Sequence, residues 1–275
     1  QTFVGRQLVC RAIRPIAAGE ELTIAYGELA EASVFRRARL RAQYFFDPFP
    51  SGMLPTSTQM RDVALSSIER RSGSTWQHVQ SVPWSSSGGV LQKQSLEPQL
   101  EGMPNVEALH QQWLEGNAAM ALDDHTAAVK CFISAWSAAE TADGIRLGLC
   151  HALRHAVAKD GMDACIFAEE WNSAVVFARA LCAICDVVYP KNWPVTGLCL
   201  ARLAKLELYV GNMAEAARTS RLALEIMVIT LDDRSPLQIE VRQIEAQARA
   251  ELIAKQGAHS ESLLRGKAQA SPTTV

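Results

Sequence analysis

Hydrophobic residues follow two patterns along the chain, with short strand-like runs near the start and long helical periodicities after residue 105. The strand-like runs lie at residues 8–13 and 21–26, separated by Pro15 and by the turn pair Ala18 and Gly19. Apolar and β-branched runs bounded by turn residues are typical of β-strands. The sequence therefore predicts two short strands within residues 7–26, and no other strand signal is as strong.

A basic amphipathic helix is predicted over residues 33–44, where apolar positions alternate with Arg36, Arg37, Arg39 and Arg41. Prolines follow it closely and end it. Residues 47–105 contain most of the prolines and a Ser-Ser-Ser-Gly-Gly run at 85–89, so a connector with one short helix near residues 60–70 is expected.

From residue 106 onward, Ala, Leu and Glu are abundant and prolines are few, which predicts a helical half of about seven to nine helices. A recurring unit consists of a helix, a Gly-Asn or acidic turn, and a second helix rich in alanine. In the second copy, Ala216, Ala223 and Met227 share one helical face, leaving Arg218 and Arg221 for solvent. Small residues allow helices to approach closely, so we expect a divergent tetratricopeptide-like bundle.

Charge and hydropathy narrow the possible partners. The chain has 275 residues, 48% of them hydrophobic, and a formal net charge of -2, which gives no bulk attraction to nucleic acid. The most apolar stretch, residues 174–189, contains Arg179 and Asp186 and is shorter than the ~20 residues of a membrane span. Seven cysteines, an odd number, are scattered among apolar residues, which favours reduced thiols in the cytoplasm or nucleus.

Three side-chain groups could carry chemistry by their spacing alone. His151 with His155 and Cys182 with Cys185 have helical spacing and could imitate a Cys2His2 metal site, although their apolar surroundings favour core packing. Asp123 and Asp124 could be paired carboxylates, but their place before a helix favours capping. The arginines of residues 36–41 could contact an acidic peptide or nucleic acid, and a solvated helix face is the default interpretation.

Three segments resemble one known family. Residues 16–26 (IAAGEELTIAY) resemble the closing motif of SET domains, in which a Gly-Glu-Glu turn leads into a buried strand ending in tyrosine. Residues 36–46 (RRARLRAQYFF) are similar to the arginine-rich helix and Tyr-x-Phe that follow the SET core in the SET and MYND methyltransferase family. Residues 189–225 resemble that family's C-terminal helical domain.

This resemblance implies methyl transfer from S-adenosylmethionine to a lysine of a histone or non-histone protein or peptide. It assigns Tyr26 as the active-site tyrosine, Tyr44 as a second tyrosine of the lysine channel, and Phe46 as the aromatic residue that packs on the adenine of the cofactor. Tyrosine suits such a channel because its hydroxyl can orient a neutral amine while its ring forms a wall. The alternative is that these rings only pack in the core.

The chain departs from the family at its metal and cofactor motifs. Pro48, Pro50 and Met53 stand where the family has the three cysteines of a post-SET zinc site, so we predict that this zinc is absent. The family's Asn-His-x-Cys-x-Pro-Asn cofactor motif and its MYND module are also missing from the 275 residues. We therefore expect a C-terminal fragment that neither binds S-adenosylmethionine tightly nor methylates protein by itself.

Together these interpretations predict an α+β chain, with a small β-rich SET remnant followed by a mainly helical tetratricopeptide-like bundle. The predicted divisions are 1–46 for the end of the SET domain with its following helix, 47–105 for the connector, 106–255 for the helical domain and 256–275 for a disordered tail. Two functions stay open at this stage. The parent protein is either a protein-lysine methyltransferase or a non-catalytic interaction module that binds a partner peptide and carries a vestigial SET segment.

Overall fold

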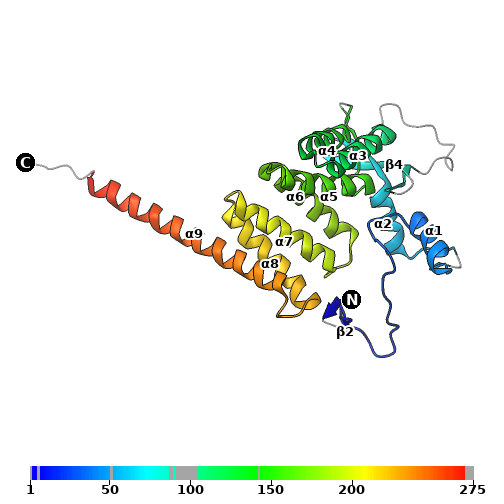
Figure 1. The fold of residues 1–275 in the computed structure, drawn as a ribbon, viewed down its shortest axis with the longest axis horizontal. Coiled ribbons are helices and arrows are strands. Elements are labelled where there is room, and N and C mark those ends of the chain that lie inside the picture. Colours follow the sequence, from blue (N-terminus) through cyan, green and yellow to red (C-terminus); the bar gives the residue numbers. More distant parts are fainter. Residues whose placement is uncertain are drawn as a thin grey trace, which may run out of the picture. The chain divides into compact units, whose positions relative to one another are not determined.

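The computed structural model describes residues 2–4, 7–49, 52–86, 89–90, 104–141 and 143–269, with only the backbone described for 2–8, 89–90 and 256–269. The chain divides into two compact units, residues 15–191 and residues 1–14 with 192–275 (Figure 1). Helices dominate both units, and the strands are short.

The first part of the 15–191 unit combines two helices with a small sheet. Helix α1 spans Ser33–Tyr44 and helix α2 spans Thr56–Ser66. An antiparallel sheet follows in the order β4-β3-β7, from β3 (Ser67–Ser72), β4 (Thr75–Ser81) and β7 (Ile145–Leu147). Gly73 turns the β3–β4 hairpin with φ +61°, a left-handed conformation that glycine adopts without strain. A second strand pair joins β5 (Trp84–Ser85) to β6 (Gly89–Val90).

Four helices form the rest of this unit, each packing on its neighbour in sequence. They are α3 (Val106–Ala121), α4 (His125–Ala138), α5 (Ala152–Phe167) and α6 (Trp171–Val188). Their shared core includes the fully buried Phe132. A Cβ atom added at Gly116 would lie 2.7 Å from the ring of Phe132, so glycine lets α3 and α4 approach closely.

The other unit is a bundle of three helices with a strand hairpin, β1 (Thr2–Val4) and β2 (Gln7–Val9). Helix α7 spans Pro194–Tyr209, α8 spans Met213–Thr230 and α9 spans Pro236–Gln269. Ala223 and Met227 of α8 pack with Ala201 and Val241 in one buried cluster. Short turns join the paired helices, which gives the hairpin arrangement of tetratricopeptide-like repeats.

Several predictions are confirmed. The chain is α+β with a mainly helical tetratricopeptide-like part, and seven helices, α3 to α9, lie within the described residues after 104. Helix α1 begins and ends where the sequence predicts. Ala216, Ala223 and Met227 are at most 1% exposed, whereas the side chains of Arg218 and Arg221 are 61% and 60% exposed.

Two element predictions are wrong. Residues 21–26 form no strand, because a strand needs a neighbouring segment to receive its backbone hydrogen bonds and the described residues provide none there. The first predicted strand is limited to Gln7–Val9, where β1 pairs with it. The helix predicted near residues 60–70 begins at Thr56 and ends at Ser66, since the next residues pair with both β4 and β7.

The chain regions predicted as a connector and a tail contain regular structure where they are described. Residues 47–105 include α2, β3, β4 and β5. The backbone of residues 256–269 continues helix α9, while residues 270–275 lie outside the described part. The repeat turns fall at Asp123–Asp124 and at Gly211–Asn212, and Gly116 lies inside α3.

Helix α6 is long and apolar enough to cross a membrane by length and composition. Its buried residues face α5 and α2 within the same unit, however, and include Phe177, Leu181 and Ile184. We interpret α6 as a core helix, because packing on neighbouring helices already covers its apolar face.

Candidate active site

The three aromatic residues assigned by resemblance lie together. The ring centroids of Tyr26 and Tyr44 are 5.4 Å apart with the planes at 66°, and those of Tyr26 and Phe46 are 5.8 Å apart at 76°. Both contacts are edge-to-face, the arrangement that aromatic quadrupoles favour. All three side chains remain 40–50% exposed. The cluster therefore forms a surface wall and is not part of the buried core.

A cleft of about 640 Å³ lies beside this wall, within the 15–191 unit. Its lining comes from residues 21–27, from α1, from the segment after α1 and from α2. The residues are Glu21, Leu22, Thr23, Ile24, Ala25, Tyr26, Gly27, Leu29, Arg36, Arg37, Arg39, Leu40, Phe46, Pro48, Phe49, Thr58 and Arg61. Small-molecule sites are commonly ~300–1,000 Å³, so the cleft has the size of a ligand site.

Asp47 fixes the segment that follows α1. Its carboxylate accepts two hydrogen bonds from Arg37, at 3.0 and 2.7 Å, another from Arg41, and one from the backbone N–H of Phe49 at 3.0 Å. The hydrogen bonds from Arg37 hold the pKa of Asp47 well below its usual range, and the same contact raises the pKa of Arg37. This network holds Asp47 and the neighbouring Phe46 beside α1.

Helix α1 is also anchored at its start. The N-cap residue, Ala32, has no side chain that could cap the helix. Asp62 of α2 supplies the missing acceptor, because its carboxylate receives hydrogen bonds from the backbone N–H of Ser33 at 2.8 Å and from the Ser33 hydroxyl. A carboxylate at a helix N-terminus is favourable for both hydrogen bonding and the helix dipole.

Two contacts attach the cleft to the end of α6. The hydroxyl of Tyr189 donates to Glu28 at 2.6 Å, and Nε of Arg61 donates to the carbonyl of Val188 at 2.8 Å. Residue pairs more than 120 positions apart in sequence thus join the SET-like segment to the helical array. Asp47, Asp62, Glu28 and Arg61 carried no local sequence signal, since each acts through a partner that only folding brings near.

The arginines of α1 are not a plain solvated face, so that default interpretation is wrong. Arg36, Arg37 and Arg39 line the cleft. Besides the Arg37–Asp47 contact, Arg39 pairs with Glu31 at 2.8 Å. Burial lowers the pKa of Arg36. Partial burial with specific partners is what distinguishes these side chains from exposed surface charges.

The possible metal and acid-base groups have structural roles. Nδ1 of His151 accepts from the N–H of Leu153 at 3.1 Å and its Nε2 bonds the Val82 carbonyl at 2.9 Å. Burial lowers the pKa of His151 to about 4, so the ring is neutral near pH 7. No group of three or more metal-ligating side chains occurs within the described ranges. Asp124 caps α4 by accepting from the N–H of Ala127 at 3.0 Å, as predicted.

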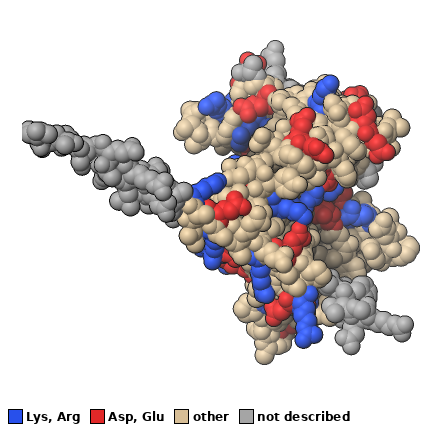
Figure 2. Space-filling model, turned by 60° about the vertical axis from the view of Figure 1, so that its left-hand side comes forward, with Lys and Arg blue, Asp and Glu red and all other residues tan. Residues whose placement is uncertain are grey.

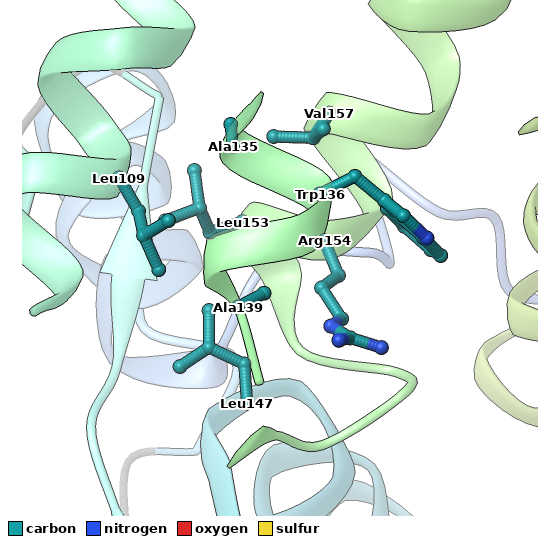
Figure 3. A pocket seen from close by; sticks show the side chains of 8 residues that line it. All are labelled: Leu109, Ala135, Trp136, Ala139, Leu147, Leu153, Arg154 and Val157. Carbon is teal, nitrogen blue, oxygen red and sulfur yellow. The ribbon is translucent and has the colours of Figure 1, made fainter. Parts of the chain in front are cut away.

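A second hollow lies among α3, α4, α5 and β7 but has no room for a ligand (Figure 3). Leu109, Leu153 and Val157 gather around it, while Arg154 stacks on Trp136 with its guanidinium carbon 4.8 Å from the ring centroid. Burial lowers the pKa of Arg154 to about 10, so it stays charged at neutral pH. This cation–π contact is a packing feature of the core.

Comparison with known proteins relates the chain to the SET and MYND type of lysine methyltransferase. The matching proteins are histone-lysine N-methyltransferase SMYD3 of Mus musculus, 27% identical over 228 residues, and SMYD3 of Homo sapiens, 26% identical over 228 residues. The match covers 83% of this chain and 44% of each relative. The chain thus spans less than half the length of these relatives. No protein-family model matches the chain.

Solved structures with similar backbones are helical repeat proteins. One is a Podosopora anserina protein described as a kinesin light chain with nearly identical tetratricopeptide-like repeats, with a TM-score of 0.40 and 18% identity over 60% of this chain and 78% of that one. A point variant of that protein gives a TM-score of 0.43 and 20% identity, covering 63% of this chain and 81% of the other.

Proposed function

We propose that the protein containing this chain is a protein-lysine N-methyltransferase that uses S-adenosylmethionine and acts on histone or non-histone lysines. The observation that carries this proposal is the edge-to-face cluster of Tyr26, Tyr44 and Phe46, of which Tyr26 and Phe46 line a ligand-sized cleft. Two segments selected by family resemblance, one ending in Tyr26 and the other carrying Tyr44 and Phe46, meet at one place. The names of both relatives support the same reaction class.

The residues present fit part of such a site. When bound, S-adenosylmethionine supplies an activated methyl group on a sulfonium. Phe46 offers an apolar ring against which an adenine could stack, and the hydroxyls of Tyr26 and Tyr44 could orient a neutral lysine amine. Methyl transfer also needs water exclusion and in-line geometry. Rings that are 40–50% exposed do not provide a dry channel by themselves, so we expect further residues to cover them.

A methyl-transfer assay tests the proposal. The chain would be expressed alone and together with whatever its gene encodes before Gln1, and radiolabelled methyl transfer to core histones would be measured. We expect activity from the longer protein and little from the chain alone. Tyr26→Phe should lower the rate on the order of 10-fold or more, because a hydroxyl donor that orients the reacting group is lost.

The exposed Tyr209→Phe serves as the matched control and should leave the rate unchanged, since its side chain is 67% exposed on α7 and does not line the cleft. Full activity of Tyr26→Phe in the longer protein would refute the catalytic assignment. Calorimetry that finds micromolar S-adenosylmethionine binding to the chain alone would contradict the expectation that this chain is incomplete as an enzyme.

A second function, a non-catalytic interaction module, is favoured by one observation. By resemblance, Pro48, Pro50 and Met53 stand where the family has its zinc cysteines, and the aromatic rings are 40–50% exposed. Such a module would bind a partner peptide on its helical array without transferring a methyl group. Absence of methyl transfer by the longer protein, together with peptide binding, would favour this alternative.

A further inference from the structure

The cleft has two chemically different walls. One wall is apolar and aromatic, with Leu22, Ile24, Tyr26 and Phe46. The lining also contains Arg36, Arg37, Arg39 and Arg61, here called the arginine wall, whereas Glu21 is the one acidic residue among the residues that line the cleft. Basic residues thus outnumber acidic ones in the lining by four to one.

Neighbouring carboxylates accept hydrogen bonds from only some of the N–H groups of these arginines. Arg37 is bound by Asp47, and Nη1 of Arg39 is bound by Glu31, whose side chain is 12% exposed and lies outside the lining. Nη2 of Arg39 is buried and makes no hydrogen bond with the described residues. That atom lies next to Gly27, since a Cβ added there would be 2.7 Å from it. A buried guanidinium nitrogen without an acceptor is costly, which favours a bound acceptor at this point.

Arg36 is the second donor that lacks an acceptor. It is half-buried on α1, and the part of the chain that the structure describes contains no ion pair for it. The nearby carboxylate of Asp62 is engaged by the N–H and hydroxyl of Ser33. Arg61 uses Nε for the Val188 carbonyl. Each guanidinium carries five N–H donors, so Arg36 and Arg61 keep donors for a ligand.

We propose that the arginine wall of this cleft binds the carboxylates of an acidic peptide segment, so that the protein selects lysines flanked by Asp or Glu. This inference rests on the proposed function and specifies its substrate class. Guanidinium groups bind carboxylates in a bidentate, charge-assisted geometry. Leu22, Ile24 and the ring of Tyr26 then receive the aliphatic part of the neighbouring lysine, and Phe46 is left for the adenine.

An acidic peptide fits better than a nucleic acid. Binding of a nucleic acid backbone depends on neutralising many successive phosphates over an extended basic surface. On the face drawn in Figure 2, basic and acidic side chains are interspersed, and the formal net charge is -2. The arginines are therefore concentrated in one cleft of about 640 Å³, and about half of the residues that line this cleft are apolar.

The test measures peptide binding by the full 275-residue chain, using fluorescence anisotropy at low ionic strength. One labelled peptide carries a lysine flanked by glutamates, and the matched peptide has glutamine at the same positions. We expect the glutamate peptide to bind at least tenfold more tightly, with an affinity that falls as salt is added. Equal affinities for the two peptides would overturn the proposal.

Variants locate the site. Arg36→Gln should reduce binding of the glutamate peptide to the level of the glutamine peptide, and Arg36→Lys should restore part of it because charge returns without the planar fork. Removal of Arg36 breaks no ion pair with a described residue, and thermal melting would verify that the variant is folded. Arg218→Gln on α8, a 61% exposed arginine, is the control and should leave binding unchanged. Equal loss in both variants would overturn the assignment to the cleft.

Two further measurements distinguish an acidic peptide from other anions that the arginines could bind. Competition by S-adenosylhomocysteine would show that the arginines take the cofactor's own carboxylate, which would overturn the peptide assignment. Tighter binding of a single-stranded RNA oligonucleotide would overturn it in favour of phosphate. Selective peptide binding without methyl transfer by the longer protein would refute the proposed function but leave the acidic-peptide site intact.

Discussion

Asp62 of α2 caps α1 from a different helix, by accepting hydrogen bonds from the backbone N–H and the hydroxyl of Ser33. The contact replaces a missing local cap, because Ala32 at the N-cap position has no acceptor. Since α1 carries Tyr44 and three cleft arginines, this carboxylate helps to orient the residues that line the cleft.

We predict that Asp62→Ala destabilises the protein by about 1–2 kcal/mol, the usual effect of losing a helix cap. Ser33→Ala removes only the hydroxyl contact and should cost less. Chemical denaturation checks both values. Asp233→Asn, whose side chain is 82% exposed, should leave stability unchanged. Equal midpoints for Asp62→Ala and the parent chain would show that α1 does not need this cap.

Asp47 gives a pH-dependent prediction. Its pKa is lowered by hydrogen bonds from Arg37, so its contribution to stability is fully present above the ordinary aspartate pKa of about 3.9 and is lost as pH falls through the lowered folded pKa. Asp47→Asn should therefore melt at a lower temperature than the parent at neutral pH, with a gap that begins to narrow near the ordinary aspartate pKa of about 3.9 and keeps narrowing as the pH falls further. A gap that stays constant down to pH ~3 would mean that the ionised form is unimportant.

Protonation linked to His151 should destabilise the fold over a higher pH range than protonation of Asp47. Its pKa is lowered by burial from 6.5 to about 4, so the unfolded chain takes up the proton first and stability falls as pH decreases between these values. The full loss is about 3 kcal/mol, from 1.36 kcal/mol per pKa unit. His151→Asn keeps an acceptor for the Leu153 N–H but cannot titrate, so the stability difference between parent and variant should change over this range.

The exposed Gln77→Asn on β4 is the control for that experiment and should reproduce the parent's pH profile, because neither side chain titrates. Stability would be measured by urea denaturation at several pH values between about 4 and 7, where the neutral ring is progressively lost from the unfolded chain. A profile of His151→Asn that parallels the parent throughout would indicate that the buried ring does not control acid stability.

Gly116 tests the close approach of α3 and α4. Alanine is a better helix former than glycine by about 1 kcal/mol, but its Cβ would lie 2.7 Å from the buried Phe132 ring. Overpacking of a rigid aromatic costs ~1–3 kcal/mol, so we expect Gly116→Ala to be destabilising by up to about 2 kcal/mol. The exposed Glu115→Ala on the same helix should be nearly neutral. A more stable Gly116→Ala would show that the ring can move at little cost.

Local pattern was sufficient for the helical elements. The alternation of apolar and arginine residues fixed α1 to its observed ends, and the spacing of Ala216, Ala223 and Met227 identified the buried face of α8. These features depend on contacts three to eleven residues apart, which a sequence displays directly. The strand at Ser67–Ser72 was missed because its charged residues pair with β4 and with the distant β7.

The sequence by itself determined the helical class, the capping role of Asp124 and the relation to SET and MYND methyltransferases, and the resemblance proposed Tyr26, Tyr44 and Phe46 as site residues. Only the tertiary structure brought Tyr26, Tyr44 and Phe46 into edge-to-face contact and gave Asp47, Asp62 and Arg61 their partners. The physical reason is the distance along the chain over which each feature arises. Helix periodicity is a local property of the backbone, which a sequence displays directly. A cleft and its ion pairs form between segments whose separation in sequence does not reveal their distance in space.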